Sequence, residues 1–241
     1  MILFDKLLGE NNPKTRKGEA SGYLTFTLSL SPAKSGGGAD VCAWRSAGCT
    51  ALCVAWQGRA RTFPHLREAR RQRTRYWNER PEAFLEALDL AILRGIRIAA
   101  KRGLLPAFRL NCFSDVPWER YLDLESYPAE FYDYTKAPLS ARRLPDNYSL
   151  CYSLSEKPGS LVQARRWLEA ERTVAVVFPK GWQARRFLGA PVVDGDENDL
   201  RFLDQPGSVI GLRAKGTANK SNSLFIVRPG SKLARKGGLQ C

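Results

Sequence analysis

Residues 148–178, YSLCYSLSEKPGSLVQARRWLEAERTVAVVF, contain the pattern that decides the fold class. Residues 148–156 and 173–178 are short runs rich in aromatic, β-branched and other apolar side chains, which is typical of strands. Residues 160–170, between them, are predicted to form a helix. A strand, a helix and a second strand in this order form a βαβ unit, whose two strands lie parallel. This stretch therefore predicts an α/β protein with a parallel sheet.

The same alternation extends along the chain in both directions. Further strands are predicted at residues 23–30, 108–115, 131–136, 192–194 and 208–215, and further helices at residues 117–127 and 183–188. Two longer helices precede most of them: an arginine-rich helix that begins near Pro64, and an amphipathic helix between Pro81 and Gly103. Repeated strand and crossover units leave two architectures, a doubly wound sheet or a barrel.

Polar side chains at the ends of the predicted strands favour the barrel. In a parallel barrel the carboxyl ends of all strands open onto one mouth, so these side chains would converge there. The alternative is that they are ordinary turn-forming residues, since Asp, Asn and Ser are common after strands. We therefore predict a single α/β domain over residues 21–228, a parallel (βα) barrel or partial TIM-like barrel, with a polar arm at 1–20 and a flexible basic tail at 229–241. The candidate catalytic residues at its mouth are Asn111, Asp115, Asp133, Lys136, Ser155, Glu156 and Asp194.

The charge of the chain indicates the kind of partner it binds. Its 241 residues include 38 Lys and Arg against 24 Asp and Glu, a formal net charge of +14. An excess of this size favours nucleic acid or another anionic substrate. No apolar run is long enough to cross a membrane, and the first residues lack the pattern of a signal peptide. The expected location is the cytoplasm, and the oligomeric state is not indicated.

Three of the six cysteines form a cluster in the sequence. Cys42, Cys49 and Cys53 follow the spacing C-x6-C-x3-C, and closely spaced thiols in a cytosolic protein indicate metal ligation rather than disulfides. Three thiolates without an obligatory fourth ligand suit a four-iron, four-sulfur cluster with one iron open to a substrate or cofactor. A structural zinc ion needs a fourth ligand, for which His65 and Asp40 are the candidates. The third interpretation is that the spacing is a coincidence.

A second candidate site lies on the arginine-rich helix. Arg67, Arg70, Arg71 and Arg75 fall close to one face of a helix that begins near Pro64, because they are three or four residues apart. Such a face contacts phosphates or is simply solvated. The alternative function is therefore nucleic-acid binding, associated with DNA or replication, with a structural zinc site in the cysteine loop.

An acidic stretch near the end of the chain has two interpretations. Asp194 and Asp196 flank Gly195, so both carboxylates could bind one divalent ion. The interpretation that we favour is an acidic loop whose carboxylates are solvated or paired with Arg201 and Arg213.

The cysteine loop resembles that of radical S-adenosylmethionine enzymes. Those enzymes have a partial βα barrel and carry three cysteines on the loop after the first strand, with the spacing C-x3-C-x2-C in place of the C-x6-C-x3-C found here. The resemblance implies a four-iron cluster on Cys42, Cys49 and Cys53, with S-adenosylmethionine as a candidate cofactor. It also implies radical chemistry on a substrate that the sequence does not identify.

A closer resemblance, to three-cysteine proteins of phages and other bacterial mobile elements, covers most of residues 23–216. The shared motifs are F-x5-AR at 63–70, RLNxxSD at 109–115, FYDYTK at 131–136, SLSE at 153–156, VAVVF at 174–178, DGDExDLRFLD at 194–204 and GLRAKG at 211–216. These motifs identify a family, and the resemblance implies no particular reaction.

Overall fold

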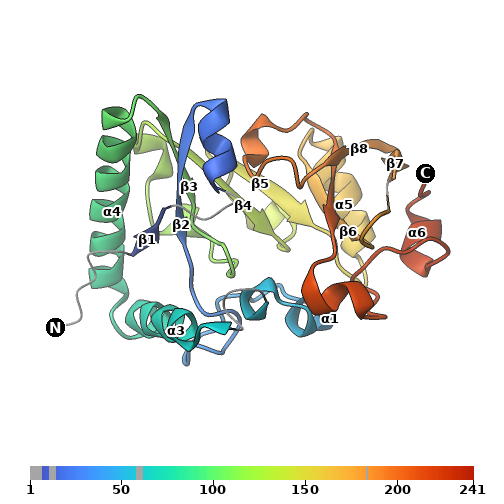
Figure 1. The fold of residues 1–241 in the computed structure, drawn as a ribbon, viewed down its shortest axis with the longest axis horizontal. Helices are drawn as coiled ribbons and strands as arrows, with labels where there is room; N and C mark the ends of the chain where they lie inside the picture. The colour runs from blue at the N-terminus through green and yellow to red at the C-terminus, as the bar shows by residue number, and fades with distance from the viewer. Residues whose placement is uncertain (1–6, 11–14, 58–61, 183) are drawn as a thin grey trace.

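The computed structural model describes residues 7–10, 15–57, 62–182 and 184–241 (Figure 1). Its strands are β1 (Leu8–Gly9), β2 (Tyr23–Leu28), β3 (Leu105–Arg109), β4 (Glu130–Thr135), β5 (Tyr148–Ser153), β6 (Val174–Phe178), β7 (Arg186–Phe187), β8 (Ala190–Asp194) and β9 (Val209–Arg213). Its α-helices are α1 (Ala47–Ala51), α3 (Pro64–Glu79), α4 (Pro81–Lys101), α5 (Ser160–Glu169) and α6 (Lys232–Lys236). The 3-10 helices are η1 (Thr15–Ser21), η2 (Val54–Trp56), η3 (Trp118–Arg120), η4 (Leu124–Ser126), η5 (Leu139–Ala141), η6 (Arg201–Leu203) and η7 (Gly216–Lys220).

The strands form one mostly parallel sheet in the order β1-β2-β3-β4-β5-β6-β9-β8-β7. From β2 to β6 each strand lies beside the next one in the chain and runs parallel to it, and β9 enters between β6 and β8. Only the short edge strands β1 and β7 are antiparallel to their neighbours. The predicted single α/β domain is confirmed. No pairing within the described residues joins β1 to β7, so the closure that a barrel requires is not shown.

The main hydrophobic core lies on the side of the sheet that α4 and α5 cover. The rings of Phe26, Phe108 and Phe131 stack across β2, β3 and β4 with centroids 5.3 Å apart at each step. Helix α4 packs closely against them at Gly95, where an added Cβ would lie 2.9 Å from the Phe108 ring. On α5, Trp167 is fully buried and stacks on Tyr152 of β5. The apolar face of each helix therefore meets an aromatic row on the sheet.

A smaller cluster covers the opposite face of the sheet. Tyr23 and Tyr132 point to that side, where their rings meet Phe202 of η6 edge-on at 4.9 and 5.6 Å. Leu200, just before η6, is buried in the same cluster. Both faces of the sheet are thus covered, as expected for parallel strands.

Strand β3 begins three residues earlier than the sequence pattern indicates. Pro106 lies inside β3 although it has no N–H to donate. The Leu105 N–H bonds to Gly22 on the β2 side, so Pro106, the next residue, faces β4. Pairing with β4 begins only at Ala107, and the missing donor therefore costs no ladder hydrogen bond.

Two predicted helices are wrong. Residues 117–127 form the 3-10 turns η3 and η4, because the buried residues Trp118 and Leu124 are six positions apart, a spacing that does not place two residues on one face of an α-helix. In the predicted helix at 183–188, residue 183 lies outside the described part of the chain. Leu188 and Gly189 of the following turn have positive φ, which ends a helix and instead joins β7 to β8 as a hairpin.

Both ends of the described chain pack against the sheet. The predicted N-terminal arm lies partly outside the described residues; within it, β1 pairs with β2 and η1 packs beside β2. The segment predicted as a flexible basic tail contains α6. Ala234 is buried there, and Gln240 exchanges backbone hydrogen bonds with Arg186. None of the described helices is both long and apolar enough to cross a membrane.

Candidate functional site

The cysteine loop lies at the carboxyl edge of the sheet, the lower edge in Figure 1, where α1 and α3 lie. Cys42 follows β2, Cys49 lies within α1, and Cys53 precedes η2. The Cys42 thiol donates to the carbonyl of Phe113 at 3.3 Å, and its sulfur accepts the Ala33 N–H at 3.3 Å. Cys42 is thereby fixed to the loop that follows β3.

The three thiols lie close enough for their charges to interact. Burial, with a smaller contribution from the neighbouring Cys49 and Cys53, raises the pKa of Cys42 to about 12. Burial also raises the pKa of Cys53, whereas Arg70 and Lys136 act to lower it. All three thiols are half-buried and none forms a disulfide. At neutral pH the Cys42 thiol therefore holds its proton, which a thiophilic metal would displace.

Arg70, which was predicted to lie on a phosphate-binding face, points toward the cysteine loop instead. Its guanidinium donates to the carbonyl of Ala55 at 2.7 Å and lies 4.2 Å above the ring of Phe113. The thiols of Cys53 and Cys112 interact with it electrostatically. No carboxylate among the described residues pairs with it, so a half-buried cation stands beside the thiols without a fixed anion.

Lys136 is a second cation at the same edge. It follows β4, and its ammonium donates to the Ser153 hydroxyl at 2.5 Å and lies 4.9 Å from the centre of the Phe225 ring. Its backbone N–H donates to Asp115 at 2.8 Å. Two of the predicted residues, Asp115 and Lys136, are thus brought together, and the charge of Lys136 acts to lower the pKa of Cys53.

Glu156 also reaches the cysteine loop. Its carboxylate accepts a hydrogen bond from the Ser46 hydroxyl at 2.8 Å and one from the Gly48 N–H at 2.6 Å. The Ser46 oxygen accepts the Cys49 N–H at 3.1 Å, which caps α1. Glu156 therefore holds the segment that carries Cys49.

A buried ionic network supports this edge of the sheet, and its central residue, Arg142, is absent from the sequence prediction. The Arg142 Nε donates to Glu119 at 2.6 Å, and Nη1 donates to Asp115 and Thr135, each at 2.9 Å. The side chain of Arg142 is 2% exposed and that of Glu119 is 0% exposed. Because two carboxylates compensate the charge, the pKa of Arg142 rises although burial acts to lower it.

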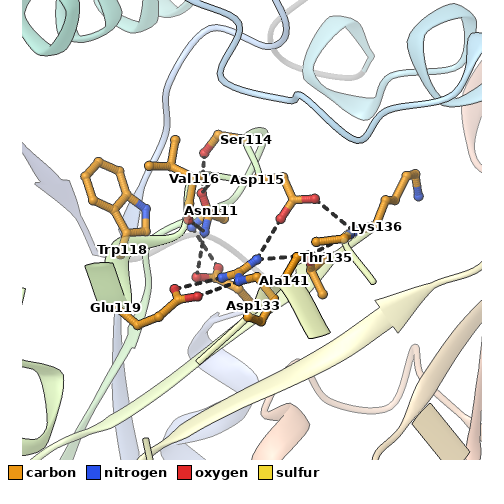
Figure 2. Close-up of polar contacts among 12 residues, drawn as sticks. Asn111, Ser114, Asp115, Val116, Trp118, Glu119, Asp133, Thr135, Lys136 and Ala141 are labelled. Carbon is orange, nitrogen blue, oxygen red and sulfur yellow. Dashed lines mark hydrogen bonds and ion pairs between the residues drawn. The ribbon is translucent and has the colours of Figure 1, made fainter. Parts of the chain in front are cut away.

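Asn111 and Asp133 meet in the second half of this network (Figure 2). Asp133 accepts the Asn111 N–H at 2.7 Å and the Tyr148 hydroxyl at 3.0 Å. The Asn111 side-chain oxygen accepts the Ser114 hydroxyl at 2.7 Å and the Val116 N–H at 2.9 Å. The side chains of Asn111 and Asp133 are therefore engaged inside the protein, where they shape the loop that holds Cys42.

The carboxyl group of Asp133 gives this network a pH dependence. Burial raises its pKa to about 7, against hydrogen bonds and arginine charges that lower it. An unfolded Asp titrates near 3.9, so the folded state binds more protons than the unfolded state between these two values. The free energy of unfolding therefore falls as the pH rises from 5 to 7 and then levels off. The raised pKa values of Asp115 and Asp204 act in the same direction.

We expect the free energy of unfolding, measured with urea, to be higher at pH 5 than at pH 8 by about 1–3 kcal/mol. Asp133 contributes a large share of this difference. An Asp133→Asn variant should have a flatter stability profile over this range, because an amide does not titrate. The exposed Asp146→Asn serves as the control and should keep the wild-type slope. A wild-type stability that rises steadily from pH 5 to 8 would contradict the assignment.

Two predicted residues bond to parts of the chain other than the cysteine loop. Ser155 is buried, and its N–H donates to the Ser160 hydroxyl at the start of α5 at 3.0 Å. Asp194 ends β8, where it pairs with Arg213 at 2.7 Å and lines a cavity of about 360 Å³. Asp196 pairs with Lys215 at 2.7 Å, so the acidic stretch is neutralised by basic residues. Arg213 is one of the two partners that the sequence suggests.

The other three arginines of the predicted phosphate-binding face differ in their exposure. Arg71 and Arg75 are exposed, and Arg71 forms an ion pair with Glu68 at 3.7 Å. Arg67 is half-buried. The four arginines therefore do not form a single free face, because Arg70 is engaged at the cysteine loop.

Neither candidate for a fourth zinc ligand stands among the cysteines as a free donor. Asp40 accepts the Cys42 N–H at 2.9 Å and forms an ion pair with Arg45. His65 is exposed and its ring contacts Phe63. Across the part of the chain that the structure describes, no three His, Cys, Asp or Glu side chains are arranged to hold a single metal ion.

A further cavity lies at the opposite, amino end of the strands. It measures about 580 Å³ and is lined by Tyr23, Pro106, Tyr127, Glu130 and Asn147, with neighbouring residues. None of the predicted site residues lines it, so the candidate site is confined to the carboxyl edge and the cysteine loop.

These observations define a single-domain α/β protein with a three-cysteine loop at the carboxyl edge of a mostly parallel sheet. A family model described as gene product 88 matches residues 4–229, and the chain belongs to this gene product 88 family. The match agrees with the resemblance to phage proteins, whereas the resemblance to radical S-adenosylmethionine enzymes has no counterpart in it. Comparison with curated proteins and with solved structures finds no match.

Proposed function

We propose that this protein binds a four-iron, four-sulfur cluster through Cys42, Cys49 and Cys53. The observation that carries the proposal is the position of Arg70, which donates to the Ala55 carbonyl at 2.7 Å beside the cysteine loop and pairs with no carboxylate of the described residues. Cys53 interacts with this half-buried cation, and Cys42 and Cys49 interact with Cys53. Thiolates and a cluster are anionic, so they would provide the counter-charge that Arg70 lacks.

The thiols fit a cluster better than a single zinc ion. Zinc requires four ligands about 2.3 Å from one centre when sulfur binds it, and the described residues do not offer such a group. A cluster is larger and holds its thiolates further apart, and three ligands leave one iron open. The bound group would supply electron transfer and an open coordination position. The residues of the chain would hold it at the carboxyl edge of the sheet, next to the cation of Arg70.

An enzymatic role of the radical S-adenosylmethionine type extends this proposal. The support is topological, since the cysteine loop follows the first long strand of a sheet whose strands β2 to β6 are parallel and consecutive. A partial barrel has this strand order. Lys136 is the basic side chain at this edge that is best placed to meet an anionic group of a cofactor or substrate, because its ammonium contacts Ser153 and the Phe225 ring but forms no ion pair with a carboxylate of the described residues.

Nucleic-acid binding with structural zinc is the second candidate function. The net charge of +14 and the exposure of Arg71 and Arg75 favour it. The engagement of Arg70 at the cysteine loop counts against a phosphate-binding face formed by all four arginines. The two candidates differ in the metal that they require.

We expect protein purified without oxygen to contain iron and acid-labile sulfide in near-equal amounts and to absorb broadly at about 400 nm, as thiolate-ligated clusters do. Elemental analysis together with the visible spectrum tests this. If iron is present, cleavage of S-adenosylmethionine under reducing conditions is the next assay. One equivalent of zinc in a colourless protein would overturn the cluster and favour the nucleic-acid function.

A further inference from the structure

We infer that Glu156, which follows β5, is a positioning residue that holds Cys49 in place for the proposed metal centre. This inference rests on the proposed function, because it assigns to Glu156 a role at the same site. The relay runs from the Glu156 carboxylate through the Ser46 hydroxyl to the backbone N–H of Cys49. Glu156 follows β5, so the relay links two parts of the chain that are more than a hundred residues apart.

Both carboxylate oxygens of Glu156 are used by the cysteine loop. Oε2 accepts the only proton of the Ser46 hydroxyl, which leaves the lone pairs of that oxygen free to accept the Cys49 N–H. Oε1 accepts the Gly48 N–H at 2.6 Å. Each oxygen of Glu156 thus bonds to the segment that carries Cys49, and the role that these contacts indicate is to hold that segment.

The packing around Gly48 allows this close approach. A Cβ at Gly48 would lie 2.7 Å from Phe225, 2.8 Å from Ser223 and 3.0 Å from Glu156. A side chain at this position would push α1 away from the carboxylate. Cys49 is therefore fixed against β5 and the segment around Phe225.

Cys42 is held by a separate set of contacts. Its sulfur bonds to the Phe113 carbonyl and the Ala33 N–H, neither of which involves Glu156. Two of the three thiols are thus anchored to different strand ends, and the sheet sets the distance between them. A site built in this way keeps its ligands apart at a fixed spacing before the metal arrives.

The inference predicts a selective effect of Glu156→Gln. One oxygen of Glu156 becomes an NH2 donor, so either Ser46 or Gly48 loses its acceptor. In the full-length metal-free protein at pH 8, the iodoacetamide reaction of Cys49 should become faster by about fivefold, the equivalent of one net hydrogen bond. The reaction of Cys42 should change less than twofold. Peptide mass spectrometry after timed labelling measures both rates in one sample.

In the iron-loaded protein, Glu156→Gln should lose iron to a chelator about 10–100-fold faster than wild type, the usual effect of removing a group that orients a metal ligand. Glu169→Gln, an exposed carboxylate on α5, is the matched control and should change neither readout. Ser46→Ala removes the relay while leaving Glu156 intact, and it should also release Cys49 selectively if Glu156→Gln folds poorly.

Equal changes at Cys42 and Cys49, or no change at either, would overturn the inference. The thiol measurement needs no bound metal. If the wild-type protein contains no iron, the proposed cluster is wrong. A selective change at Cys49 would still establish the role of Glu156 in placing that thiol.

Discussion

Replacing Arg142 by methionine is expected to lower the free energy of unfolding by about 3–5 kcal/mol, because it leaves two buried carboxylates without their cation. Arg142 bonds to Glu119 through two nitrogens, at 2.6 and 3.0 Å, and to Asp115 through a third at 2.9 Å. Methionine fills a similar volume but offers no donor. Urea unfolding at pH 7.5 measures the loss.

The neighbouring arginine provides the control. Arg143 has a side chain that is 72% exposed and lies 3.9 Å from Glu125, so Arg143→Met should change the stability by less than about 0.5 kcal/mol. Adding Glu119→Gln to Arg142→Met should recover part of the loss, since it removes one uncompensated charge. Equal effects of Arg142→Met and Arg143→Met would show that the buried network does not stabilise the fold.

The Arg142 network connects the stability of the sheet to the cysteine loop. Asp115 bonds to Arg142 through its side chain, and its own N–H donates to the carbonyl of Val41, next to Cys42. Phe113, two residues earlier, accepts the Cys42 thiol. Loss of Arg142 should therefore loosen the loop around Cys42 before it affects α1, which is held from β5.

Local patterns were sufficient to predict the fold class. The strand-like runs at 148–156 and 173–178 and the helix between them correspond to β5, β6 and α5. The two proline-initiated helices begin at Pro64 and Pro81, as predicted. These features depend on periodicity, proline placement and glycine stops, which act over a few residues and can be read without the tertiary structure.

The side of the sheet that each polar residue faces could not be read in the same way. Alternation places Asp133 on the face of Phe131 and Thr135, and places Tyr132 and Tyr134 on the other face. Each set contains at least one aromatic residue, so the sequence does not show which one meets the helices. The structure buries Asp133 on the side of α4 and α5, where it bonds to Asn111 and Tyr148.

The difference between Arg142 and Arg143 was also hidden from the sequence. The two residues are identical and adjacent, and only the path of the chain after Pro138 determines that the first points inward. Its partners, Glu119 and Asp115, lie more than twenty residues away. Ser46 is also absent from the sequence prediction, although it has a local signal: it lies just before the helix that carries Cys49, and serine is a preferred N-cap.

Substituting Cys42, Cys49 and Cys53 together by alanine should reduce the iron content of the purified protein to background and remove its visible absorption. Thiolates are the ligands that hold such a cluster, and this variant removes all three of the cysteine loop. We expect each single Cys→Ala variant to lose most of its iron as well, because two remaining thiolates leave two irons without a protein ligand. Iron and sulfide analysis of protein purified without oxygen measures the loss.

Two of the other cysteines supply a control with the same chemistry in different surroundings. Cys151 is buried beside Ala175 and Ile210, and Cys241 is the exposed last residue. A variant with alanine at these two positions should keep its iron, since neither is among the thiols that interact with Cys42 or with Arg70. Iron that survives the triple substitution, or that is lost equally from both variants, would assign the metal to other ligands. The comparison of iron content between the two variants therefore tests whether iron binding depends on the cysteines at the sheet edge or only on the number of thiols in the chain.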